Sequence, residues 1–473
     1  MTKKTLSHRA CLLWGTILAA TFATSATARA AFTQTSDAQI AVDGRSSHRT
    51  EGAKAAVAQV EDQKSAFHAQ MTFVAQANRP FRSAFSGPNS LKATGELRET
   101  ADVTGYAGFR PWSGAEIWVN GELDQGFGLR NTLGAAGFPN GEAYKVGKKT
   151  PYPRLPRLFA RQTVNFGGEY ETVGADLNQL RSKRATNRLV LTAGKFGVTD
   201  VFDTNVYSHD PRADFLNWSL IDAGTLDYAA DAWGYTIGAA AELYLGRFAL
   251  RGGFFNLSTV PNGEHLEKHF KQYEALGEIE ERHSLRGRPG KVKLTAFVNH
   301  GNMARLSEAV AFGAATGEAA DVAAVRRFAS RPGASINIEQ EVADDIGLFL
   351  RAGLADGRYE AFEFTDIDRT ISGGVSVLGK RWGRPGDHLG VAFAINQASR
   401  DRRRFLDAGG LGVLTGDGKL PHPGNEHILE SYYDLAVSKN LHFTPDFQLI
   451  DHPGYNKERG PVAILSARFH AQF

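Results

Sequence analysis

Polar, charged and aromatic side chains recur at every second position of several short segments. In residues 115–123 these positions carry Glu116, Trp118, Asn120 and Glu122. By the same alternation, other segments present Arg98, Arg161, Arg251, Glu339, Arg351 and Glu430, together with Tyr106 and Tyr432. Arginine donates several hydrogen bonds, carboxylates accept them, and an aromatic ring can stack on the C–H face of a sugar. A surface of this composition fits a neutral, hydroxyl-rich solute.

The two signs of charge occur in similar number on this polar face. Strong anion or cation selectivity would need an excess of one sign, so the balance predicts neither. The simpler explanation of any single side chain is that it solvates a wet face and pairs with an opposite charge there. Solute contact and plain solvation both remain open from the sequence.

The sequence lacks the spacings typical of enzymes and metal proteins. His265 and His269 are four residues apart, but they lie in a polar segment with no third ligand nearby. No G-x-S-x-G nucleophile motif, P-loop or dinucleotide fingerprint occurs. We therefore predict no catalytic residues, no metal and no cofactor, and transport that is passive.

The final segment alternates most strictly. From Ala463 to Phe473 every second residue is apolar, and the residues between include Ser466, Arg468 and His470. Period-two alternation predicts a β-strand with one apolar and one polar face. An aromatic residue at the end of such a strand is typical of outer-membrane β-barrels. Past residue 30, no stretch approaches the roughly 18 apolar residues of a membrane helix, which agrees with a barrel.

Sixteen segments fit strands in the same way. They are 68–77, 95–109, 115–123, 158–180, 187–198, 232–244, 247–257, 273–285, 291–300, 333–343, 346–355, 370–382, 388–398, 427–438, 441–450 and 461–473. The connections between them alternate between short and long, as periplasmic turns and extracellular loops do in an up-and-down barrel. We predict an all-β fold, a 16-stranded antiparallel transmembrane β-barrel over residues 68–473. The fourth segment should be bent or longer than the membrane requires, and the Ala-rich stretch 311–324 should be helical within a loop.

The N-terminal residues have the features of a secretory signal. A basic start precedes an apolar run at 10–23 and the small-residue motif Ala28-Arg29-Ala30. Cleavage after Ala30 would remove Cys11, the single cysteine, and would leave 50 basic against 51 acidic residues. This balance gives no support to a nucleic-acid partner. Residues 31–67 should form a periplasmic N-terminal segment. Its composition is compatible with a short helix at 53–63 and equally with a disordered tail.

Several short motifs follow one another along the chain. They include Ser86-Gly87-Pro88-Asn89-Ser90-Leu91, Gly194-Lys195-Phe196, Asp227-Tyr228-Ala229-Ala230, Trp382-Gly383-Arg384 and Pro453-Gly454-Tyr455-Asn456. In this order and spacing, the chain resembles the carbohydrate-selective porins, the OprB-like family of bacterial outer membranes. The resemblance covers residues from about His68 to Phe473. It implies a sixteen-strand porin that passes monosaccharides such as glucose, or related small sugars, down their gradients.

The resemblance also implies a narrow zone lined by charged and aromatic side chains of the wall and of infolded loops. Its main candidates here are Arg82, beside the first loop, and Arg98 and Glu116 on adjacent strands. The long connection 124–157 could fold inward. The expected partners are small sugars, outer-membrane lipid and lipopolysaccharide, and the barrel-assembly machinery through the C-terminal strand, with a homo-oligomer left open. A less selective general diffusion porin is the main alternative, and an outer-membrane barrel enzyme is a weaker one.

Overall fold

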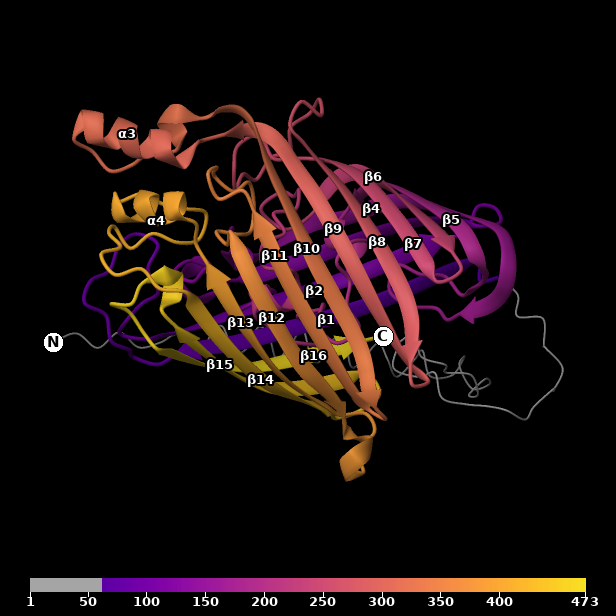
Figure 1. The fold of residues 1–473 in the computed structure, drawn as a ribbon. Coiled ribbons are helices and arrows are strands. Elements are labelled where there is room, and N and C mark those ends of the chain that lie inside the picture. The colour runs from indigo at the N-terminus through magenta and orange to yellow at the C-terminus, as the bar shows by residue number, and fades with distance from the viewer. Residues whose placement is uncertain (1–61) are drawn as a thin grey trace. The chain divides into compact units, whose positions relative to one another are not determined.

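Sixteen strands of the computed structural model pair in chain order and close into one antiparallel barrel, with β1 beside β16 (Figure 1). The structure describes residues 62–473. The strands are β1 (Ser65–Asn78), β2 (Glu96–Phe109), β3 (Ala115–Gly126), β4 (Lys148–Val173), β5 (Ser182–Phe196), β6 (Thr236–Leu245), β7 (Phe248–Asn256), β8 (Tyr273–Leu285), β9 (Arg288–Met303), β10 (Arg327–Ala343), β11 (Ile346–Ala355), β12 (Arg369–Leu378), β13 (His388–Gln397), β14 (Glu426–Ala436), β15 (Leu441–Asp451) and β16 (Val462–Gln472). Closure pairs the backbone of every strand, which a hydrocarbon environment requires.

The helices are short and lie in the connections between strands. They are α2 (Trp218–Ile221), α3 (Leu306–Thr316) and α4 (Arg400–Asp407), with 3-10 turns at Leu129–Asn131, Val198–Asp200, Ala323–Val325, Gly379–Trp382 and Pro453–Tyr455. The helix predicted for 311–324 is confirmed only in its first half, because α3 begins earlier and ends at Thr316, and a 3-10 turn follows at Ala323–Val325. No helix in the part of the chain that the structure describes is long and apolar enough to span a membrane.

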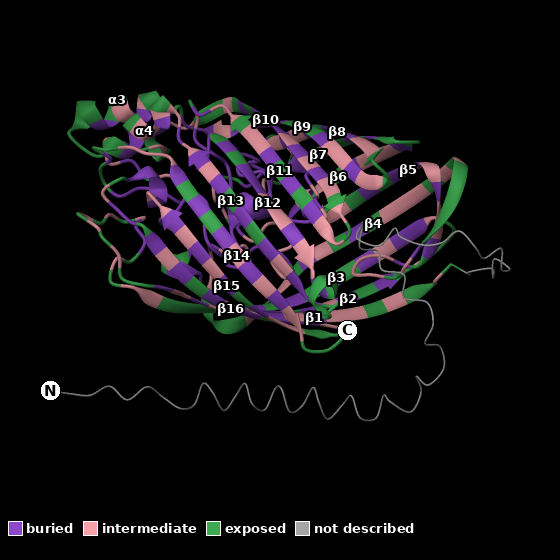
Figure 2. Ribbon diagram, turned by 60° about the horizontal axis from the view of Figure 1, so that its bottom comes forward, coloured by how far each residue is buried: buried purple, intermediate pink, exposed green. Residues whose placement is uncertain are grey.

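The two faces of the wall follow the predicted alternation, as the purple and green bands along the strands in Figure 2 illustrate. In β3, Trp118 is fully buried, whereas the next residue, Val119, is 40% exposed on the outer face. The same phase places Leu350 outside and Arg351 inside on β11. The assignment of inward and outward residues from sequence is thus confirmed in these strands.

The strand β4 departs most from the prediction. It was expected at 158–180 but spans Lys148–Val173, so the connection before it covers 127–147 instead of 124–157. Pro151, Pro153 and Pro156 argue against a strand in this stretch, since proline cannot donate to a ladder. Residues 148–157, however, pair with β3 on one side only, and β5 joins from Leu158 onward. Pro151 and Pro153 lie where β4 has an open side, and Pro156 lies where the register with β3 shifts, as at a bulge.

Short and long connections alternate around the barrel as predicted. The end with the short connections, here called the short-turn end, carries the turns 110–114, 174–181, 246–247 and 344–345. The opposite end, the long-loop end, carries α3 and α4 (Figure 1). The predicted signal and residues 31–61 of the predicted N-terminal segment lie outside the described residues, and β1 begins at Ser65.

Candidate functional site: an arginine-lined passage beside an inserted loop

The connection between β5 and β6, residues 197–235, folds into the barrel; it is called the inserted loop below. Its apolar side chains are buried, among them Phe202, Phe215 and Trp218. Trp218 stacks on Phe138 of the 127–147 connection at a ring distance of 5.2 Å, so a second loop also folds inward. Burial of these rings away from water stabilises the inward position of both loops.

Carboxylates of the barrel wall hold the inserted loop by its backbone. Each accepts hydrogen bonds from loop N–H groups: Glu278 from Asp203 (2.8 Å), Glu339 from Val206 (2.9 Å), Glu430 from Leu216 and Asn217 (2.5 and 3.0 Å), and Glu274 from Ala229 (2.8 Å). A loop inside the barrel has no neighbouring strand with which its backbone can pair. The wall carboxylates therefore supply the hydrogen-bond partners that its buried amides need.

Wall arginines bind the loop through its carbonyl oxygens. Arg351 donates to the carbonyls of Leu220 (2.7 Å) and Ser208 (2.8 Å). Its Nε also lies 3.3 Å from the Asp203 carboxylate. Arg468 donates to the carbonyls of Pro211, Asp214 and Ala213.

Three predicted site residues belong to this set of anchors. Arg351 and Glu430 are fully buried, and Glu339 is 4% exposed. They lie beneath the inserted loop, so in this conformation they position the loop and do not face the passage. Alternation predicts that they point inward, but it cannot show that a loop covers them.

The wall opposite these anchors carries a row of arginines on β4. Arg154 lies nearest the long-loop end, Arg157 follows, and Arg161 lies nearest the short-turn end. The Arg154 guanidinium lies 4.7, 5.1 and 5.4 Å from the ring centres of Trp233, Tyr144 and Tyr235. This arrangement combines hydrogen-bond donors with aromatic faces.

Arg157 pairs with a carboxylate of the inserted loop. Its Nε and Nη2 donate to the two Asp200 oxygens at 2.8 and 2.6 Å. Burial alone would raise the pKa of Asp200, but the Arg157 guanidinium outweighs it and holds the pKa below its usual range. Asp200 therefore stays ionised at neutral pH, and the pair offers a donor and an acceptor side by side.

A cavity of about 360 Å³ lies at the short-turn end below the inserted loop. Its lining includes Arg161, Arg184, Arg188, Asp200 and Thr204. Predicted residue Arg251 also lines it and pairs with Glu242 (3.0 Å), Glu278 (2.7 Å) and Glu280 (2.9 Å). Four arginines on one cavity surface make it electropositive, and the acids Asp200 and Glu242 on the same surface limit the excess of positive charge.

Glu116 meets two other predicted residues, Trp118 and Arg161, at the edge of this cavity. Its carboxylate lies 3.6 Å from Arg161 and 3.9 Å from Arg184, and it accepts a hydrogen bond from the Trp118 indole at 3.0 Å. The structure thus brings Glu116, Trp118 and Arg161 together. Farther along the same wall, Glu122 lies 3.8 Å from Arg154 and accepts hydrogen bonds from Thr104 and Tyr144.

Arg98 and Glu116 do not form one constriction. Arg98 is near the start of β2 at the long-loop end, where it pairs with Glu96 at 2.8 Å. Glu116 is at the start of β3 next to the short turn 110–114. Because β2 and β3 are antiparallel, about twelve residues, roughly 40 Å of strand, separate them. Arg82 also lies at the long-loop end and donates to the Lys457 carbonyl at 2.7 Å.

Sequence reasoning missed the roles of Arg157, Trp233 and Tyr235, and placed Arg154 in a loop. The alternation of Arg157, Phe159 and Arg161 could have identified the inward face of β4. Trp233 and Tyr235 fall within the predicted strand 232–244, but β6 begins only at Thr236, so both residues lie in the inserted loop.

The closed barrel with inserted loops defines the class of protein as an outer-membrane porin. The chain matches the carbohydrate-selective porin, OprB family, over residues 88–473 and belongs to that family. The protein is a sugar-selective porin of the outer membrane, and its fold and family point to a channel rather than an enzyme.

Solved structures resemble the chain in fold. The high-pH structure of OprB from Pseudomonas putida is 16% identical, with a TM-score of 0.65 over 87% of this chain and 94% of that one. The outer-membrane channel DcaP of Acinetobacter baumannii is 9% identical, with a TM-score of 0.49 over 86% and 97% of the two chains. The search of curated proteins gives no match.

Proposed function

We propose that small sugars such as monosaccharides diffuse passively along the β4 wall, between the Arg154–Arg157–Arg161 row and the inserted loop. The observation that carries this proposal is the grouping of the Arg154 guanidinium with the rings of Trp233, Tyr144 and Tyr235. Guanidinium groups can donate to sugar hydroxyls, and the rings can stack on the C–H faces of the sugar.

The short-turn cavity supports a small solute. Its volume of about 360 Å³ lies near the lower end of the range for small-molecule sites, which is roughly 300–1,000 Å³. Weak individual contacts suit a pore, since tight binding would slow the exit of the solute. We assign Arg161 and Arg251, which line the cavity, to this route. Glu116 and Glu122 lie beside the route and limit the positive charge of Arg161 and Arg154, and the fully buried Trp118 supports the Glu116 carboxylate from behind.

Arg82 and Arg98 would act earlier, at the mouth. The long-loop end is the extracellular side in an up-and-down barrel of this kind. The Arg98 side chain is 45% exposed there and could meet incoming solutes. We propose a capture role for these two residues in place of a constriction shared with Glu116.

The expected partners other than sugars remain proposals. The outward band of leucine and phenylalanine side chains would contact outer-membrane lipid, and the rim would contact lipopolysaccharide. The C-terminal strand β16, which ends one residue before Phe473, would engage the barrel-assembly machinery during insertion. A homo-oligomer would need a further contact surface on the outer wall.

Single-channel conductance with a panel of sugars as blockers tests the route. We expect Arg157→Ala and Trp233→Ala each to weaken sugar block about tenfold, which corresponds to a loss of about 1.4 kcal/mol. Arg286→Ala, on a short turn, is the control and should leave block unchanged. Sugar block that is absent in the parent would favour a general diffusion porin, and unchanged block in both variants would exclude this route.

A further inference from the structure

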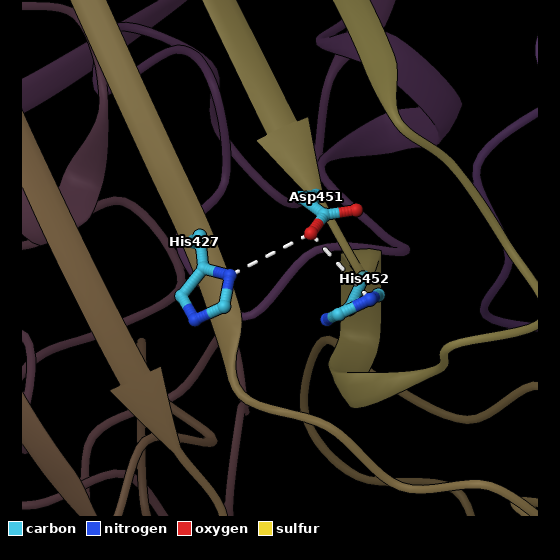
Figure 3. A group of neighbouring side chains, drawn as sticks. All are labelled: His427, Asp451 and His452. Carbon is cyan, nitrogen blue, oxygen red and sulfur yellow. Dashed lines mark ion pairs between the residues drawn. The ribbon is translucent and has the colours of Figure 1, made fainter.

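Two histidines and an aspartate meet at the long-loop rim, away from the sugar passage (Figure 3). His427 is the second residue of β14, and its Cα partner across the ladder is Asp451, the last residue of β15. His452 follows directly and begins the connection to β16. His427 and Asp451 occupy outward positions of their strands, since the buried inward neighbours are Glu426, Ile428 and Ile450.

The three side chains are spaced as metal ligands are. His427 Nδ1 lies 3.6 Å from Asp451 Oδ2, and His452 Nε2 lies 3.4 Å from the same oxygen. All three ligand atoms lie within 4.8 Å of one another. A tetrahedral Zn²⁺ with bonds of about 2.0–2.1 Å separates its ligand atoms by roughly 3.3–3.5 Å. Both measured separations are longer than a direct hydrogen bond and close to this value.

A hydrogen bond fixes which nitrogen of His452 faces the group. His452 Nδ1 lies 3.0 Å from the Asn425 carbonyl oxygen. A carbonyl cannot donate, so Nδ1 carries a proton and Nε2 is the nitrogen directed at the Asp451 carboxylate. A lone pair and a carboxylate at 3.4 Å need a cation between them or a second proton on the ring. A backbone carbonyl that holds the outer nitrogen of a ligating histidine is a common feature of metal sites.

We propose that His427, Asp451 and His452 bind a divalent transition-metal ion, with Zn²⁺ as the best fit. Imidazole nitrogen suits Zn²⁺, Ni²⁺ and Cu²⁺ better than Mg²⁺ or Ca²⁺, which prefer oxygen ligands. The side chains are 47%, 40% and 22% exposed for His427, Asp451 and His452, so an ion can reach them from solvent. Three protein ligands leave at least one coordination position open to water or an external group.

A bound ion would connect the β14 rim to the connection 452–461. Gly454, two residues after His452, donates to the Glu426 carboxylate, which also accepts from Ala136 and Gly137 of the inward 127–147 connection. The metal site therefore lies on the outer face of the rim. On the inner face, Glu426, the neighbour of His427, contacts the loops that narrow the lumen. The ion would stabilise this rim without touching the sugar route.

Titration calorimetry with ZnCl₂ tests the proposal. The sample is the purified porin in detergent, without a polyhistidine tag and treated beforehand with a chelator. We expect one Zn²⁺ per chain. His427→Ala and His452→Ala should each lower the affinity at least about tenfold, while His269→Ala, an exposed loop histidine, should leave it unchanged. Heat-modifiable electrophoretic mobility confirms that each variant is a folded barrel.

A second measurement separates a metal site from a protonated His–Asp ion pair. Co²⁺ in place of Zn²⁺ should give visible absorption bands with the parent and lose them in Asp451→Asn, a substitution that keeps the size of the side chain. Absence of Zn²⁺ binding by the parent would overturn the proposal. Binding that survives in both histidine variants and in Asp451→Asn would also overturn it, because the ion would then reside elsewhere.

Discussion

Replacing Arg351 by alanine is expected to loosen the inserted loop and weaken sugar selectivity while the barrel stays closed. The Arg351 side chain is fully buried, and it donates to the Leu220 and Ser208 carbonyls and pairs with Asp203. Its removal would deprive the Asp203 carboxylate and the carbonyls of Leu220, Ser208 and Asp203 of one partner each inside the barrel. Removing one partner of a buried ion pair costs about 3–5 kcal/mol.

This cost falls on the loop rather than on the wall. The strand β11 keeps its backbone ladder to β10 and β12, whereas the inserted loop loses one of its anchors. Since about 1.4 kcal/mol corresponds to a factor of ten, the population of displaced loop should rise roughly 100- to 4,000-fold. Glu339 and Glu430 would still hold the loop at other points, so displacement is local.

Single-channel recording in planar bilayers provides the assay. Arg351→Ala should show larger and noisier salt conductance than the parent, with sugar block reduced by at least about tenfold. Arg351→Lys keeps the charge but loses the forked geometry and should fall between the two. Arg381→Ala, which removes an arginine that donates to the Asp344 carbonyl at the short-turn end, is the matched control. Folded Arg351→Ala channels with parental conductance and parental sugar block would refute the anchoring role.

Three further predictions concern the wall, the passage and pH. Leu350→Arg, at a residue that is 39% exposed on the outer face, should lower the free energy of unfolding by about 2–4 kcal/mol in refolding assays. Thr163→Arg, at a residue that lines the short-turn cavity, should lower it far less. Equal losses of stability would contradict the face assignment. Asp200→Asn should leave Arg157 without its charged partner, so the reversal potential in a salt gradient should shift in the direction of greater anion selectivity. Asp321→Asn, in an outer loop, should leave the reversal potential unchanged. Burial lowers the pKa of Lys145 to about 8, so the unfolded chain binds more protons between about pH 8 and pH 10.4 and the stability should rise over that window. Lys145→Met should flatten this rise in thermal unfolding measured from pH 7 to 11, and an unchanged slope would count against the burial of the amine.

The sequence by itself determined the strands and the two faces of their wall. Alternation is a local property of a strand, since successive side chains point to opposite sides whatever the partner is. Val119 and Leu350 could therefore be placed outside, and Trp118 and Arg351 inside, from single segments. The alternation of short and long connections also predicted that consecutive strands pair in chain order, because a short turn can join only neighbouring antiparallel strands.

Only the tertiary structure decided what covers the inward face and which residues meet there. Arg351 and Glu430 point inward as predicted, but the inserted loop, whose path depends on packing against many strands, converts them from candidate sugar contacts into anchors. The separation of Arg98 and Glu116, by contrast, already follows from the predicted strands 95–109 and 115–123: in an antiparallel hairpin Glu116 is next to the turn and Arg98 is at the far end, as the register confirms.

The rim histidines show the same limit for metal chemistry. Sequence spacing predicted no metal, because it compares residues that are close along the chain. His427 and Asp451 are brought together by the pairing of β14 with β15, and the Asn425 carbonyl then orients His452. Ligand geometry depends on cross-strand register and on a backbone hydrogen bond, and neither is encoded in a local pattern of residue types.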